Sequence, residues 1–321
     1  MNRRHFSRLL AASPLLMCPI ARSQEGSVTT LIVPYPPGGN TDYVARIASD
    51  SLRRTLGLSV VVKNQAGAGG TIATESLIRS RNDGSTLMIA SIGQVSLVRF
   101  LFNVRYDPLK DLVPVANIAG NPLVLTVPSR SRFQNLAQLI EYGRANPGAL
   151  TVAHGGEGSM SHMSVSVFLK RAGIEAALIG YRGGAPALLD TMGGTADLYS
   201  ANISEILPYK ESGRIRFLGV SSAKPVPQLP GIPVIADTIT GYQIETWNGL
   251  FAPAGTPTEV IDRLADAVQA MLRDPGVLSK FEASGSDPRV GEVKEKFAHR
   301  IREDIALWTP LVQLIGVKPA N

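Results

Sequence analysis

The first residues that could do chemistry form a turn rich in proline and glycine, PYPPGGNTD at residues 34–42. Branched apolar residues at 31–33 predict a buried strand before it, and apolar spacing from Val44 to Leu56 predicts an amphipathic helix that opens at Asn40. Such a turn brings free backbone N–H groups to the end of a strand, where the positive end of the helix dipole can hold an anion. A well-capped connection without a ligand fits the same residues, so the turn alone leaves both interpretations open.

Later strands are predicted to end in residues of the same kind. Small or polar residues follow them at 91–94, 154–159, 181–185 and 202–204. Ligands of open α/β sheets bind outside the carboxyl ends of the strands. We therefore expect these segments to gather around one site.

Other kinds of chemistry fit these residues less well. The HGG segment at 154–156 is similar to the oxyanion segment of esterases, and GVSSA at 219–223 comes near a nucleophile elbow, but its last position is Ala and no histidine follows an acid in triad order. His154 and His162 lie eight residues apart without a metal-binding pattern. The glycines at 67–70 precede a bulky residue where a dinucleotide fingerprint needs a small one. We predict no catalytic residue, no metal and no cofactor, and keep a secreted hydrolase as an alternative.

The first 23 residues predict an export signal. Three arginines without an acid precede an apolar run at 9–20, and small residues at 21–23 offer a cleavage site near Ser23. The run is shorter than the about 20 residues of a membrane-spanning helix. Paired arginines at 3–4 leave twin-arginine export and ordinary secretion both open. We expect a soluble mature protein in the periplasm.

Composition excludes several function classes. The chain has 321 residues, 44% of them apolar and 18% charged, which is ordinary for a soluble α/β protein of two domains. Removing residues 1–23 lowers the net charge from +6 to about +2, which argues against nucleic-acid binding. The only cysteine, Cys18, lies in the signal, so the mature protein has no disulfide.

Strands and helices alternate along the whole chain, as in a parallel sheet covered by helices. Strands are predicted at 31–33, 58–63, 86–90, 150–153, 176–180, 197–201, 216–221 and 246–252, with two more apolar segments, 113–119 and 123–127, separated by Gly-Asn-Pro. Four prolines within 224–233 predict a stiff segment that passes between domains, and a last long helix is predicted at 293–315.

Six stretches, taken together and in order, resemble one family. They are LIVPYPPGGNTD, VVVKNQAGAGG, NVRYDPLKDLVPVANIA, GEGSMSH, YRGGAPALLDTMGGTADL and WNGLFAPAGTP. The chain resembles the extracytoplasmic binding proteins of tripartite tricarboxylate transporters, the Bug proteins. The resemblance implies a type II periplasmic-binding-protein fold with two α/β domains, residues 27–124 with 247–321 and residues 125–246, and a ligand cleft between them.

The resemblance also implies a function and a set of site residues. Such proteins capture a small organic carboxylate, an amino acid or an aromatic acid and pass it to two membrane permease subunits. We expect a monomer, and a ligand-sensing role in a signalling system remains an alternative. The ligand-binding residues implied are Tyr35, Gly38, Gly39, Thr41, Asp42, Ser91, Gly93, Gly158, Ser159, His162, Gly183, Gly184, Ala185 and Asn202. For Asp42 and His162, a purely structural role at a helix start remains open.

Four residues are candidates for ligand specificity. His154 and Glu157 depart from the pattern of the family, and Arg99 and Arg182 add cations near the same rim. If Glu157 faces the cleft, its carboxylate repels a ligand carboxylate. The sequence therefore predicts a zwitterionic or amide-bearing ligand rather than a simple dicarboxylate.

Overall fold

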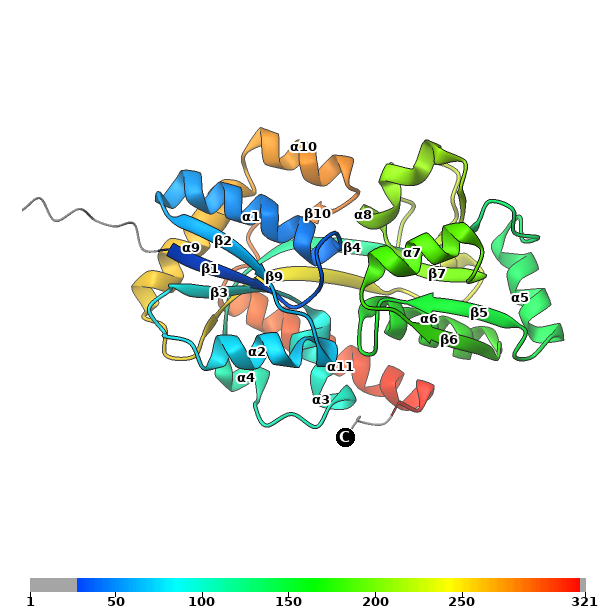
Figure 1. The fold of residues 1–321 in the computed structure, drawn as a ribbon, viewed down its shortest axis with the longest axis horizontal. Helices are drawn as coiled ribbons and strands as arrows, with labels where there is room; N and C mark the ends of the chain where they lie inside the picture. The colour runs from blue at the N-terminus through cyan, green and yellow to red at the C-terminus, as the bar shows by residue number, and fades with distance from the viewer. Residues whose placement is uncertain (1–27, 318–321) are drawn as a thin grey trace, which may run out of the picture.

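The computed structural model describes residues 28–317, so the predicted export signal lies outside the described residues. Strands and helices alternate as the sequence predicts, and helices lie on both faces of the strands (Figure 1). The strands are β1 (Val28–Val33), β2 (Ser59–Asn64), β3 (Thr86–Ser91), β4 (Leu112–Pro128), β5 (Leu150–His154), β6 (Ala176–Gly180), β7 (Leu198–Asn202), β8 (Ile215–Val220), β9 (Glu245–Pro253) and β10 (Asp287–Pro288). The longer helices are α1 (Asn40–Leu56), α2 (Thr71–Ile78), α5 (Leu136–Ala145), α6 (Met160–Ala172), α7 (Gly184–Gly193), α9 (Thr258–Met271), α10 (Pro275–Ala283) and α11 (Glu295–Ile315).

The strands form one mixed sheet in the order β2-β1-β3-β9-β4-β7-β5-β6, with β8 and β10 also paired to β4. At one end, β1 runs parallel to β2 and β3, and at the other end β5 runs parallel to β6 and β7. The long strands β4 and β9 run antiparallel to each other in the middle. Parallel strands that alternate with helices therefore make up each end of the sheet, and two long strands join the ends.

The division of β4 into two segments was wrong, because β4 is a single strand of 17 residues. Residues 112–122 pair with β9, and residues 123–128 pair with β7 and β8. Pro122, which has no N–H to give to a ladder, stands where the partner of the strand changes. The Gly-Asn-Pro signal therefore marks a change of partner within one extended strand rather than a break between two segments.

The role predicted for the proline-rich segment was also wrong. Val220 donates its N–H to the carbonyl of Pro233, and Val220 and Val234 form a parallel bridge, so the segment folds back onto β8. Leu229 and Val234 share a core cluster with Tyr199 of β7. The chain returns to the first end of the sheet through β9 instead.

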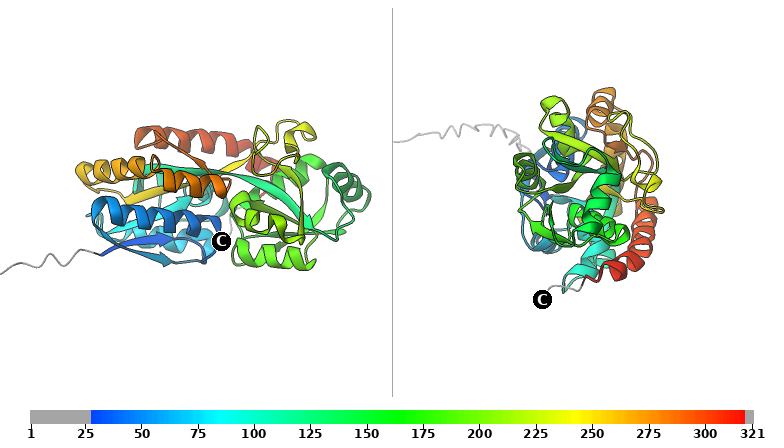
Figure 2. Two further views of the ribbon diagram at one scale, coloured as in Figure 1. Left: turned by 90° about the horizontal axis from the view of Figure 1, so that it is seen from above. Right: turned by 90° about the vertical axis from the view of Figure 1, so that its right-hand side faces the viewer.

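Two helices at the C-terminal end complete the fold. The sequence analysis missed α10, although Asp274 accepts hydrogen bonds from the N–H groups of Gly276 and Val277 and Pro275 holds the first position. The last helix, α11, lies along the outside of the molecule (red in Figure 2) and contacts β4, α6 and the short π-helix Gly93–Leu97. Within residues 28–317, no helix has both the length and the apolar character that crossing a bilayer requires.

Candidate functional site

A cavity of about 60 Å³ lies between the loops from the two ends of the sheet. The loops after β1 and β3 line one side, and the loops after β5, β6 and β7 line the other. The predicted site residues that line it are Tyr35, Gly39, Thr41, Ser91, Ser159, Arg182, Gly183, Gly184, Ala185 and Asn202. Predicted residues that do not line it are Gly38, Asp42, Arg99, Gly93, His154, Glu157, Gly158 and His162.

Tyr35 presents a hydroxyl group whose orientation is fixed by Gln94. The Gln94 side-chain amide donates to the Tyr35 hydroxyl at 2.8 Å and to the carbonyl of Gly69 at 2.9 Å, and its oxygen accepts from the N–H and hydroxyl of Ser91. Burial raises the pKa of Tyr35, although the bonds to Gln94 and Ser91 oppose this shift. A tyrosine hydroxyl that accepts one bond can also donate one, and Tyr35 is among the residues that line the cavity. The sequence analysis missed Gln94 because nothing local shows that it reaches back to Tyr35.

Asn40 connects the start of α1 to distant parts of the chain. Its side-chain amide donates to the side-chain oxygen of Asn248 at 2.6 Å, and Asn248 donates to the Thr41 hydroxyl at 3.0 Å. The Ser204 hydroxyl donates to the Asn40 side-chain oxygen at 2.8 Å. The opening turn, β9 and the segment after β7 therefore meet at one buried polar network.

Asp42 stabilises the turn that precedes α1. Its carboxylate accepts hydrogen bonds from the N–H of Gly38 at 3.0 Å, from Arg46 at 2.9 and 3.1 Å and from Asn64 at 2.9 Å. Burial alone would raise the pKa of Asp42, but these bonds outweigh burial and lower it. Arg99, another candidate, pairs with Asp107 at 3.4 Å and does not reach the cavity.

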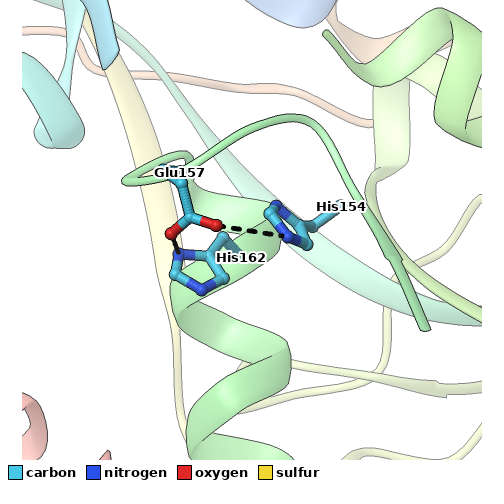
Figure 3. A group of neighbouring side chains, drawn as sticks. All are labelled: His154, Glu157 and His162. Atoms are coloured by element: carbon cyan, nitrogen blue, oxygen red, sulfur yellow. Dashed lines mark ion pairs between the residues drawn. The ribbon is translucent and has the colours of Figure 1, made fainter. Parts of the chain in front are cut away.

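His154, Glu157 and His162 lie together beside the cavity (Figure 3), which the sequence spacing did not predict. The Glu157 carboxylate lies 3.8 Å from Nε2 of His154 and 3.5 Å from Nδ1 of His162. Burial lowers the pKa of both histidines, and that of His162 falls to about 4 because the neighbouring His154 adds to the effect and Glu157 only partly offsets it. Glu157 faces a neighbouring groove that it shares with Gly69 and Phe102.

Two imidazoles and a carboxylate are a ligand set that suits a transition metal. Their nearest ligand atoms lie within 4.8 Å of one another. The Nδ1 atom of His162, however, accepts the N–H of Gly158 at 3.3 Å, which fixes the start of α6. This agrees with the structural role considered for His162 from the sequence.

Glu205 is the acid that lines the cavity, and the sequence analysis missed it. Its carboxylate accepts from the Tyr199 hydroxyl at 2.8 Å, from the Asn202 side chain at 3.1 Å and from the N–H of Asn40 at 3.3 Å. A Cβ atom on Gly184 would lie 2.6 Å from both carboxylate oxygens, so Gly184 permits the approach of Glu205 to the start of α7. Burial raises the pKa of Glu205, and the bonds from Tyr199, Asn202 and Asn40 oppose this shift.

The hydrolase alternative is not supported. Ser221, in the segment compared to a nucleophile elbow, is fully buried. Its hydroxyl donates to the carbonyl of Ile244 and accepts the N–H of Leu123 at 2.8 Å. The hydroxyl therefore holds β4 to the chain before β9.

The chain matches one protein family over most of its length. A model of the tripartite tricarboxylate transporter family receptor, TctC, matches residues 44–317. Among solved structures, Rpa4515 from R. palustris with adipate has a TM-score of 0.88 at 33% identity, covering 91% of this chain and 98% of that chain. The periplasmic binding protein BugD has a TM-score of 0.87 at 30% identity, covering 91% and 99%. MatC from Rhodopseudomonas palustris with bound malate has a TM-score of 0.84 at 28% identity, covering 89% and 98%. The chain therefore belongs to the tripartite tricarboxylate transporter receptors, which are non-enzymatic periplasmic solute-binding proteins of mixed α/β fold.

Proposed function

We propose that this protein captures a small organic acid in the cavity between the two ends of its sheet and delivers it to the membrane subunits of a tripartite transporter. The carrying observation is that the cavity is lined by the starts of α1, α6 and α7, which offer neutral hydrogen-bond donors, together with Tyr35. Arg182 and Glu205 are the charged residues in this lining. Each helix start contributes about 0.3 to 1 kcal/mol toward an anion without a salt bridge. The adipate and malate in Rpa4515 and MatC are acids of this class.

The proposed ligand contacts are divided between two domains. In this proposal, residues 27–124 and 247–321 form one domain, residues 125–246 form the other, and the domains close around the ligand. Tyr35, Gly39 and Ser91 contribute from the first domain, and Ser159 and Gly184 contribute from the second. Gly38, Asp42, Gly93, Gly158 and His162 hold the loops that carry these groups.

The proposed setting follows from the family and the sequence. The protein is exported, its signal is cleaved near Ser23, and the mature protein works as a monomer in the periplasm. It receives the acid there and transfers it to two permease subunits.

Two tyrosine variants test the proposal. Tyr35→Phe removes the hydroxyl of a residue that lines the cavity, whereas Tyr43→Phe removes a hydroxyl that bonds the Lys280 carbonyl and whose residue does not line it. Isothermal titration with succinate, malate, adipate and their amino and amide counterparts is expected to find a bound acid. Tyr35→Phe should weaken the binding free energy of this acid by about 1.5 to 3 kcal/mol, the value of a hydrogen bond to a charged group. Tyr43→Phe should leave the affinity for the acid unchanged.

Two results would contradict the proposal. One is that no acid of the panel binds or raises the thermal unfolding midpoint with increasing concentration. The other is that Tyr35→Phe binds the acid as tightly as the wild type does.

A further inference from the structure

The Glu205 carboxylate lies where the proposed function places an acid ligand. It reaches the N–H of Asn40 at the start of α1 and lies against Gly184 at the start of α7. These two helix starts are the ones that line the cavity beside it. The protein therefore brings an acidic side chain of its own to a site suited to anions.

Burial raises the pKa of the Glu205 carboxyl above its usual value, and the hydrogen bonds that Glu205 accepts oppose this shift. Its three hydrogen-bond partners, Tyr199, Asn202 and the N–H of Asn40, all donate to it. Hydrogen bonds donated to a carboxylate stabilise the charged state. Within residues 28–317, Glu205 makes no ion pair with a lysine or arginine, although Arg182 lines the same cavity. The carboxyl oxygens of Glu205 are therefore oriented as acceptors by these donors, without an ion pair.

Glu205 also keeps acceptor capacity for a ligand. A carboxylate has about four acceptor sites, and Glu205 uses three of them in the described structure. The residue lines the cavity, so a group inside can approach it. A ligand carboxylate there would meet a like charge, whereas an N–H group would complete the set of donors.

We propose that Glu205 binds a nitrogen-borne hydrogen-bond donor of the ligand, an ammonium or an amide, so that the preferred ligand is an acid with such a group and not a plain dicarboxylate. This proposal rests on the proposed function, because it assigns one end of the same ligand. Arg182 lines the cavity from its exposed rim and suits the carboxylate end. The sequence pointed to the same ligand class through Glu157, but the Glu157 side chain is 70% exposed and lies in the neighbouring groove.

A purely structural role for Glu205 makes a different prediction. Glu205 also joins the segment after β7 to the start of α1, so a variant can weaken closure of the cavity. Weaker closure would reduce the affinity for every acid by the same factor. A subsite for N–H groups instead changes the ratio between ligands of equal length, and this ratio is the quantity to measure.

The experiment compares ligands that differ only at one end. Succinate, succinamate and 4-aminobutanoate form one series, and adipate with its monoamide and 6-aminohexanoate forms a second. Each is titrated calorimetrically into the wild type, Glu205→Gln and the control Glu157→Gln. The wild type should bind an amide or ammonium member at least about tenfold more tightly than the matching dicarboxylate. Glu205→Gln should reduce this ratio by about tenfold or more, and Glu157→Gln should keep it.

The remaining outcomes separate the two proposals. If acids bind but the dicarboxylate is preferred in the wild type, or the ratio is the same in Glu205→Gln, the Glu205 proposal is wrong and the proposed function stands. If no acid binds, the proposed function itself is wrong. Thermal unfolding checks that Glu205→Gln is folded. Glu205→Asp is a second variant, which should keep the preference for an N–H group at lower affinity because it retracts the charge by one methylene.

Discussion

Acidification should destabilise the protein through His162. Burial and the neighbouring His154 lower the pKa of His162 from 6.5 to about 4, so the folded state binds this proton more weakly than the unfolded chain does. The stabilising contribution is complete above pH 6.5 and is lost as the pH falls toward 4. Between pH 7 and pH 5 the two pKa values give a loss of about 2 kcal/mol in the free energy of unfolding.

The substitution His162→Gln removes the titrating group and keeps an oxygen that can accept the N–H of Gly158. Urea unfolding at pH 5, 6 and 7, followed by the fluorescence of the buried Trp247 and Trp308, measures the free energy at each pH. From pH 7 to pH 5 the free energy of unfolding should fall by about 2 kcal/mol more in the wild type than in His162→Gln. The control is His299→Gln, whose side chain is 66% exposed. Equal losses in the wild type and His162→Gln would refute the reasoning.

Two further substitutions probe buried groups. Burial raises the pKa of Asp304 to about 6, despite the attraction of a neighbouring arginine and the bond from Trp247. The contribution of Asp304 to stability is therefore lost as the pH rises from about 4 to about 6. Asp304→Asn keeps an acceptor for Trp247 and should raise the free energy of unfolding at pH 7 by about 1 to 3 kcal/mol, a gain that disappears below pH 4 in the same urea assay. Gly184→Ala places a Cβ 2.6 Å from the Glu205 oxygens and should abolish the calorimetric preference for N–H-bearing acids, whereas Gly193→Ala, at the other end of the helix in open space, should keep it. Equal binding by the two alanine variants would contradict the placement of Glu205.

Rules that depend on neighbouring residues were sufficient to predict many of the strands and helices. Proline and glycine after residues 31–33 stop a strand by steric restriction alone, and α1 begins at Asn40 as predicted. Apolar spacing located the long helix α9, because this helix buries one stripe of its surface. The alternation of strands and helices then predicted the edge of the sheet at which the loops meet. These features depend on neighbours within a few residues.

The side chains that shape the cavity depend on partners far along the chain. Asn40 and Asn248 are 208 residues apart, and Gln94 and Tyr35 are 59 apart. Nothing in the sequence around these residues predicts either contact, because a side-chain amide can hydrogen-bond to water as well as to another side chain. The signal for Glu205 was an acid three residues after Asn202, just past a strand end, but an exposed acid at a helix start has the same pattern. Only the approach of α1 to the segment after β7 distinguishes an acid that lines the cavity from an exposed acid at a helix start.

Asp42 and Glu205 show why the position of an acid does not by itself decide its role. Both lie near the start of α1, and both accept backbone N–H groups there. Asp42 has Arg46 one helical turn away, which balances its charge within the turn and leaves it nothing to offer a ligand. Glu205 accepts from donors but has no ion-pair partner in the described structure, so its carboxyl oxygens remain available to a group that enters the cavity. The acid that selects the ligand is therefore the one that the protein itself leaves without an ion-pair partner in the described structure.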